Sequence, residues 1–443
     1  MLFRIRGTLE DITDRGAAMA FRTWSRALAI AAVTVRRGCA ALPALALSGS
    51  RTRRAVLRKH LRTLLTDLGP SFVKGAQLLS TRQDLLPREI CEVLGRLHDQ
   101  VAPMSEEDAR EAVRSAYAGR PWPFADFDWE PVASGSIACV YRAVLADGRQ
   151  VAVKVRRVGI GPRMRADFAL AESGARLMER LPGMRGLPAG EIVRQCRDAV
   201  LAQLDFEAEV EALDSLRRNL GDLAYLRVPE PVREAGAEGV LVMEYLPGLR
   251  RIRPEELPAE VAELVVKRVL RCAYRMLFIH GLVHCDLHPG NLYIAPDGGI
   301  VILDAGFVVR LEPRVRRLFA EFFLNMARGN GPYCADIVIR SARSIGEHAD
   351  LDTFREGIGA LVAGAASRSA RDFRLAPFAA KLFDLQRRSG LYAAPEFVFP
   401  LLSLLVLEGM INEFHADVDF QNEAKPVLFK ALLTGVPIQR KAS

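Results

Sequence analysis

Cysteine and aromatic residues are both scarce in this chain. Its 443 residues contain seven cysteines, far apart and never spaced as a metal clip. This argues against a disulfide framework and predicts free thiols in a reducing compartment. Aromatic residues make up 7% of the chain, and Phe3, Phe21 and Trp24 are the only ones among the first 62 residues. A stacking platform for single-stranded nucleic acid is therefore not expected there.

Long hydrophobic runs are also missing. Ala27–Val35 is apolar, but Arg36 and Arg37 interrupt the run before it resumes over Gly38–Leu47. A transmembrane helix needs about 20 apolar residues. The run starts too late for a signal peptide, and no small-residue cleavage site closes it. We expect neither a signal peptide nor a transmembrane helix, while a helix lying in the membrane interface stays open.

Acidic residues are nearly missing from the first 62 residues, which hold 13 Lys and Arg but three Asp and Glu. This arm has a net charge of +10, and the whole chain has +8, so the remainder is slightly acidic. Such an arm suits an anionic membrane surface or nucleic acid, or is a solvated helix pair. We favour a membrane lipid surface, expect no nucleic acid, and predict a cytoplasmic protein peripheral to the membrane.

Hydrophobic residues are abundant. They form 50% of the chain, enough for one large core or two to three ordinary ones. Period-two patterns predict strands over Val132–Tyr141, Val151–Val155 and Val240–Tyr245. Helical patterns cover 51–118, 163–220 with a break at 181–190, 257–280 and 312–443. Residues 118–128 are predicted as a linker, Asp147-Gly148 as a hairpin turn, and Phe397–Leu407 as a buried core helix.

A polar loop places His284, Asp286 and Asn291 in the H-x-D-x-x-x-x-N order of a phosphoryl-transfer loop. The apolar run after it ends at Asp304 in an Asp-Ala-Gly turn, which resembles the Asp-x-Gly metal-binding turn. Mg²⁺ prefers a few oxygen ligands, completed by waters and substrate phosphates. Asn291 and Asp304 are therefore the predicted metal ligands. Asp286 is predicted to accept the proton of an attacking hydroxyl or to orient a water.

The hairpin upstream carries the positions of a phosphate-binding loop. Counting G-x-G-x-x-G-x-V back from Val140 places its three glycine positions on Ala133, Gly135 and Ala138. Small residues let backbone N–H groups approach phosphates, although this loop is stiffer than an all-glycine one. The predicted nucleotide-binding residues are Ala133, Ser134, Gly135, Ser136, Ala138, Val140, Lys154, Glu244 and Tyr245.

Lys154 alternates with valines and occupies the position of the lysine that holds the α- and β-phosphates and pairs with a helical glutamate. Asp205 and Glu209 are four residues apart on one predicted helix face, so either can face Lys154. Glu244 and Tyr245 end the strand expected at the hinge, where backbone groups would bind adenine. Asp286, Lys154 and Glu209 are the predicted catalytic residues.

Together these segments resemble the UbiB-type atypical kinases, a family tied to ubiquinone biosynthesis and isoprenoid-lipid homeostasis. The resemblance covers roughly residues 65–425. Lys74 and Gln77 match the ends of the family's K-x-G-Q helix, residues 284–291 match its H-x-D-x-H-P-G-N loop, and Asp304 matches its metal-binding aspartate. The resemblance implies ATP and Mg²⁺ as cofactors and a K-x-G-Q region that covers the site where a protein substrate would lie.

Four positions depart from the family pattern: Ala76, Gly135, Gln203 and Ala305. Gln203 replaces the first acid of an E-x-D motif and cannot pair with a lysine as a charge. Lys74, Gln77, Gln203 and Asp205 are the predicted regulatory residues, because the resemblance places them in the latch between the K-x-G-Q helix and its acidic partners.

The predicted fold is a two-lobed, protein-kinase-like α+β fold with a helical N-terminal extension. Its predicted parts are a basic helical arm over 1–62 with membrane-surface contact, a K-x-G-Q-type extension over 63–125, a kinase-like N-lobe with a helical insert over 126–248, and a helical kinase-like C-lobe over 249–443. The predicted function is an ATP-dependent phosphotransferase or ATPase that supports ubiquinone biosynthesis or isoprenoid-lipid homeostasis beside lipid- and quinone-pathway enzymes. A non-catalytic nucleotide-binding scaffold and a protein Ser/Thr kinase stay open.

Overall fold

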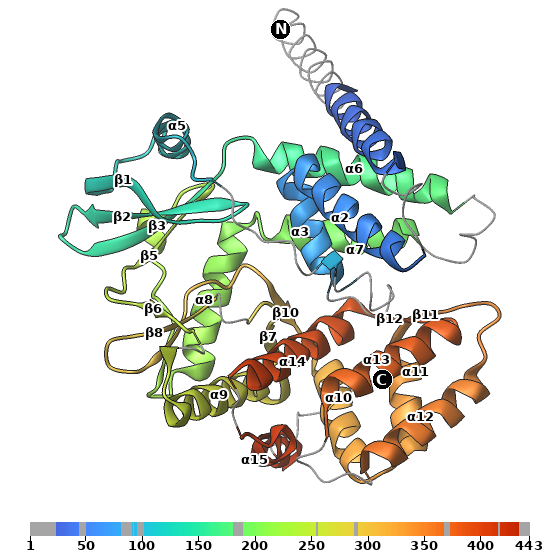
Figure 1. Ribbon diagram of the computed structural model, residues 1–443. Coiled ribbons are helices and arrows are strands. Elements are labelled where there is room, and N and C mark those ends of the chain that lie inside the picture. Colours follow the sequence, from blue (N-terminus) through green and yellow to red (C-terminus); the bar gives the residue numbers. More distant parts are fainter. Residues whose placement is uncertain are drawn as a thin grey trace, which may run out of the picture.

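The computed structural model describes residues 24–43, 50–80, 91, 93–94, 102–179, 189–253, 256–287, 291–366, 373–414 and 417–433. They form a lobe built on one sheet and a larger helical lobe (Figure 1). The sheet is antiparallel with strand order β1-β2-β3-β5. Its strands are β1 (Phe124–Ser134), β2 (Ala138–Leu145), β3 (Gln150–Arg156) and β5 (Val240–Glu244).

Two helices flank this sheet, α5 (Glu106–Ala116) and α8 (Phe206–Leu220). Side chains alternate along a strand, so Val153 and Val155 of β3 share a buried cluster with α5, and Ala152 belongs to the main core that includes α8. Lys154 has the same parity as Ala152. The alternation therefore turns its side chain toward α8.

The N-terminal extension packs beside the sheet lobe. It comprises a helix over residues 24–43, α2 (Ser50–Leu68) and α3 (Pro70–Ser80), and α3 packs against α6 (Ile160–Met178) and α7 (Ala189–Ala202). Arg26 ties these parts together, because its guanidinium donates to buried Asp167 of α6 at 2.5 Å and to the carbonyl of Leu68 at 2.5 Å.

The helical lobe begins with short strands that flank the predicted catalytic loop, residues 284–291. One sheet has the order β4-β9-β8-β6, and β7 pairs with β10. These strands are β4 (Leu226–Arg227), β6 (Arg250–Arg251), β7 (Leu282–His284), β8 (Leu292–Ile294), β9 (Ile300–Ile302) and β10 (Val308–Arg310). The helices are α9 (Ala259–Tyr274), which continues as a π-helix over Arg275–His280, α10 (Pro313–Ala327), α11 (Gly331–Ser341), α12 (Leu351–Ala366), α13 (Leu375–Arg388), α14 (Pro395–Glu413) and α15 (Phe420–Leu433).

Several predicted segments need correction. β1 starts at Phe124, inside the predicted linker 118–128, and the helix predicted over 163–220 breaks again at residues 203–205. The region 312–443 is not helical throughout, since β11 (Ala342–Ile345) pairs with β12 (Leu391–Ala393). The predicted core helix is confirmed, because Val398 and Leu407 of α14 are fully buried. Among the helices described, none is both long and apolar enough to cross a membrane.

Candidate functional site

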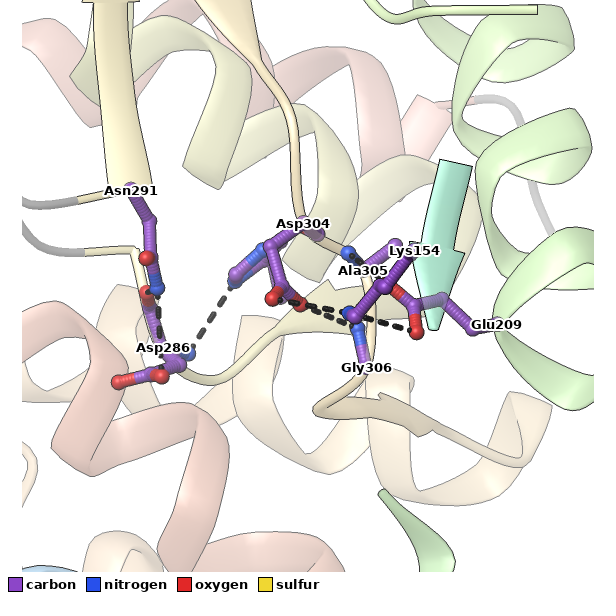
Figure 2. A network of polar contacts seen from close by, with 8 residues as sticks. Lys154, Glu209, Asp286, Asn291, Asp304, Ala305 and Gly306 are labelled. Atoms are coloured by element: carbon purple, nitrogen blue, oxygen red, sulfur yellow. Dashed lines mark hydrogen bonds and ion pairs between the residues drawn. The ribbon is translucent and has the colours of Figure 1, made fainter. Parts of the chain in front are cut away.

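Lys154 of β3 lies at the centre of a buried cluster of charges contributed by both lobes. Its ammonium contacts the two carboxylate oxygens of Glu209, from α8, at 2.7 and 2.8 Å, and one oxygen of Asp304 at 3.3 Å. The side chains of Lys154 and Glu209 are 13% and 2% exposed, whereas that of Asp304 is 46% exposed. Figure 2 shows Lys154 between the two carboxylates, with Asp286 and Asn291 beyond Asp304.

These contacts shift the pKa of each group. Burial lowers the pKa of Lys154, but the carboxylates of Asp304 and Glu209 outweigh it and raise the value overall. Burial raises the pKa of Asp304, yet the Lys154 ammonium and the Gly306 N–H together hold it below its usual range. Burial raises the pKa of Glu209, an effect that Lys154 opposes. The contacts therefore favour the charged forms of Lys154 and Asp304, whereas burial opposes the ionisation of Glu209.

His284 connects the predicted catalytic loop to the predicted metal-binding turn. Its ring is buried, and Nδ1 accepts the backbone N–H of Asp286 at 3.2 Å. This assigns the proton to Nε2, which donates to the carbonyl of Asp304 at 2.6 Å. The Ser403 hydroxyl of α14 holds the His284 carbonyl at 2.8 Å. Sequence reasoning missed Ser403, whose one signal is a polar residue inside the apolar run Phe397–Leu407.

Asn291 and Asp286 form the second half of the site. The Asn291 amide Nδ2 donates to the backbone carbonyl of Asp286 at 2.8 Å and to its carboxylate at 3.2 Å. The amide nitrogen is thereby engaged with Asp286, and the amide oxygen is the atom of Asn291 that would act as the predicted metal ligand. Asp304 keeps one oxygen on the N–H of Gly306 at 2.7 Å and turns the other toward Lys154.

These side chains fit a magnesium ion by their donor chemistry. Mg²⁺ takes oxygen ligands and keeps several waters, so it is held by one or two side chains together with substrate phosphates. Asn291 and Asp304 supply such oxygens. No group of three His, Cys, Asp or Glu side chains is gathered as a metal site in the described part of the chain.

The predicted phosphate loop is the turn between β1 and β2. Gly135 N–H donates to the carbonyl of Ala138 at 2.9 Å and closes the turn. Ser136 and Ala138 are buried, whereas Ala133 is exposed. Ser134 and Val140 are half-buried. A Cβ placed on Gly135 would lie 3.6 Å from the Ala138 oxygen, an ordinary contact. The turn therefore has room for the alanine of the family pattern at this position.

The backbone N–H groups of the predicted hinge, Glu244 and Tyr245, are already hydrogen-bonded within the protein. Glu244 N–H donates to the Glu230 carbonyl at 2.8 Å, and Tyr245 N–H donates to the Gln150 carbonyl at 3.3 Å. The Glu244 carboxylate also pairs with Arg227. Both hinge N–H groups are thus engaged within the protein, so neither is a free donor for an adenine edge.

The predicted regulatory residues do not all converge. Lys74 of α3 lies close enough to Asp304 for its charge to help lower the pKa of that carboxyl, after the effects of burial and Lys154. Gln77 is half-buried on the same helix. The prediction that Asp205 can face Lys154 is wrong: its carboxylate is the N-cap of α8 and accepts the N–H groups of Glu207 and Ala208. The Gln203 amide donates to the carbonyl of Ala199, one turn earlier.

Some predicted motif residues cannot be placed. His288, Pro289 and Gly290 of the predicted catalytic loop lie outside the described residues.

Comparison with known proteins bears on the family and the fold. Residues 96–337 match the ABC1 atypical kinase-like domain. Curated proteins named "Probable protein kinase UbiB" from Cellvibrio japonicus (strain Ueda107) and Vibrio atlanticus (strain LGP32) are 32% and 31% identical over 84% of this chain, covering 68% and 70% of their own length. A solved structure of Rv3197 from Mycobacterium tuberculosis, in complex with erythromycin, aligns at a TM-score of 0.55 and 18% identity over 79% of this chain and 90% of that one. The predicted kinase-like α+β fold is thereby confirmed.

Proposed function

Because this chain belongs to the ABC1 atypical kinase-like family, together with UbiB proteins, we propose that it binds Mg-ATP where its lobes meet and acts as a phosphotransferase or ATPase. Its membership confirms the resemblance that the motifs predicted. The observation that carries the proposal is the contact of Lys154 with both Glu209 and Asp304, beside Asp286 and Asn291. Lysine, carboxylates and amide are the groups that phosphoryl transfer uses.

Each residue then has a role set by its contacts. Glu209 fixes the Lys154 ammonium, which holds phosphate oxygens. Asn291 and Asp304 hold the metal ion, which neutralises phosphate charge when bound. Asp286, whose carboxylate already accepts the Asn291 amide, positions the attacking hydroxyl or water and accepts its proton. Because positioning and charge provide most of the catalysis in phosphoryl transfer, these roles are sufficient for turnover.

We also propose that the protein works at a membrane surface beside lipid- or quinone-pathway enzymes and supports ubiquinone biosynthesis or isoprenoid-lipid homeostasis. The support for membrane contact is the helix over residues 24–43. Trp24, Leu28, Val35 and Leu42 are 72%, 66%, 64% and 64% exposed. They are spaced by four, seven and seven residues, so they share one helix face.

The opposite side of this helix holds it to the protein. Arg26 pairs with Asp167, and Arg37 pairs with Asp67 at 2.5 Å. The apolar face is thereby presented to solvent, while Arg36, 67% exposed, pairs with Asp67 at 3.0 Å. An exposed face of tryptophan and aliphatic side chains, on a helix whose other side carries arginines, is typical of a helix that lies in a lipid interface.

The test is ATP turnover by the purified protein at varied Mg²⁺, with and without cardiolipin-containing liposomes. We expect turnover that rises with liposomes and disappears in Asp304→Asn. Leu28→Ser combined with Val35→Ser should reduce liposome binding and stimulation but leave basal turnover unchanged. Ala29→Ser, at an exposed position off the apolar face, is the matched control.

Each of the other outcomes points elsewhere. Nucleotide binding without turnover under any condition would contradict the enzymatic proposal and favour a scaffold. Transfer of phosphate to an added protein would indicate a protein kinase. Liposome binding that is equal for the double variant and for Ala29→Ser would contradict the proposed membrane-binding face.

A further inference from the structure

A single arginine holds the turn between β1 and β2. Arg157 follows the last residue of β3, three residues after Lys154. Its Nε donates to the carbonyl of Gly135 at 2.8 Å, and one terminal nitrogen donates to the Ser134 hydroxyl at 2.8 Å. Its backbone N–H donates to the carbonyl of Ile137 at 2.9 Å. The same residue therefore holds the turn at three points, Ser134, Gly135 and Ile137.

The same guanidinium also reaches outside the turn. The terminal nitrogen that contacts Ser134 donates to the carbonyl of Ala102 at 2.7 Å, in the segment that precedes α5. Across the described residues, Arg157 has no carboxylate partner, and its side chain donates only to neutral oxygens. Its neighbour Arg156, by contrast, contacts the carboxylate of Glu238 at 3.4 Å. The guanidinium of Arg157 thus hydrogen-bonds the turn and the segment before α5.

We propose that Arg157 is the positioning residue for nucleotide phosphates, because it fixes the turn over residues 133–138 relative to Lys154. This inference rests on the proposed nucleotide binding. Backbone N–H groups of such a turn face phosphates only if the turn is ordered, and ordering it during binding would reduce affinity. Gly135 is the residue of the turn with the greatest conformational freedom, and Arg157 holds its carbonyl directly. Arg157 and Lys154 also share one strand end, so the clamp sets the spacing between the turn and the ammonium.

A purely structural role makes a different prediction. If Arg157 merely anchors the segment before α5 through Ala102, removing its side chain should lower stability without affecting nucleotide affinity. The role in positioning requires instead that affinity falls whenever the turn loses its fastening, including in Ser134→Ala, which leaves the contact with Ala102 intact.

The experiment measures the dissociation constant and KM for Mg-ATP, kcat, and hydrogen exchange of the turn amides in the nucleotide-free protein. For Arg157→Ala we expect faster exchange in the turn and about tenfold weaker ATP binding, the loss of roughly one charge-assisted hydrogen bond. KM should rise by a similar factor and kcat should change little, since Arg157 contacts neither Lys154 nor Asp286. Arg157→Lys should be intermediate, because an ammonium cannot reproduce the planar fork.

Two further variants keep the test decisive. Ser134→Ala should weaken binding by about threefold, as expected for one hydrogen bond. Arg142→Ala is the control. This β2 side chain is 51% exposed, and its contact with Asp128 is long, at 3.8 Å. If Arg157→Ala does not fold, Arg157→Lys and Ser134→Ala carry the same prediction.

The outcomes separate the two proposals. Wild-type affinity in Arg157→Ala, Arg157→Lys and Ser134→Ala would overturn the role of Arg157 and leave the proposed function standing. A fall in kcat with unchanged KM would also overturn it. Failure of the wild-type protein to bind ATP would overturn both.

Discussion

Replacing Glu209 with glutamine tests the charge cluster most directly. The glutamine has nearly the same shape, so the packing around this position of α8 is kept while the charge is removed. Lys154 loses a carboxylate that it contacts at 2.7 and 2.8 Å and keeps Asp304 at 3.3 Å. Because the Lys154 side chain is 13% exposed, water cannot fully replace the lost partner.

The expected magnitude follows from this burial. Removing one partner of a buried ion pair costs about 3–5 kcal/mol when the remaining charge has no other partner. Asp304 still contacts Lys154, so we expect a smaller loss, about 2–3 kcal/mol in the free energy of unfolding. In the nucleotide complex a misplaced ammonium should lower kcat/KM by about 100-fold, which corresponds to about 2.7 kcal/mol.

The assays are urea denaturation and ATP turnover over a range of Mg²⁺ concentrations. In Glu209→Gln the ammonium should move toward Asp304 and compete with the metal for that carboxylate, so a higher Mg²⁺ concentration should be needed for half-maximal turnover. Glu207→Gln is the control, because Glu207 lies exposed in the first turn of the same helix. Turnover within about twofold of wild type, with an unchanged urea midpoint, would refute the reasoning.

Three further predictions concern stability. Arg26→Ala should lower the free energy of unfolding by about 3 kcal/mol, because it leaves the buried Asp167 carboxylate without the guanidinium that contacts it at 2.5 Å. Urea denaturation measures this loss. The control is Arg36→Ala, which removes an exposed ion pair that contributes about 0–1 kcal/mol. Burial lowers the pKa of His280 below its ordinary 6.5, so as the pH falls the unfolded chain protonates this imidazole before the folded protein does. The melting temperature should therefore fall as the pH drops below 6.5, and it should fall less steeply in His280→Asn. Gly281→Ala should cost about 1–2 kcal/mol because its φ is +68°, and an unchanged melting temperature would contradict this.

The order of the motifs predicted most of the site, because each motif has its chemistry within a few residues. Lys154, Asp286, Asn291 and Asp304 lie on short strands and turns whose local sequence fixes their direction. Asp205 shows the limit. A spacing of four residues puts two side chains on one helix face only if both lie inside the helix, and here Asp205 precedes the first turn and caps it.

Contacts between distant segments could not be predicted from local patterns. The pair of Arg26 and Asp167 joins residues 141 positions apart, and the basic composition of the arm gives no reason to single out Arg26. The strands β11 and β12 are short and lie between long helices, so their period-two signal is too weak to compete with the helical pattern around them. Ser403 and Arg157 likewise donate to backbone carbonyls of distant segments, and a local pattern does not specify which carbonyl a polar side chain will reach.

The distances in the charge cluster indicate how the site changes when it is used. Lys154 holds Glu209 by two contacts of 2.7 and 2.8 Å but Asp304 by one longer contact of 3.3 Å. The contact with Asp304 is the weaker one, and Asp304 is also the more exposed carboxylate. If Asp304 turned to the proposed metal ion, Lys154 would have donors left for phosphate while Glu209 kept it in position. Binding of the metal and binding of phosphate should therefore favour each other, because both require the same 3.3 Å contact to open.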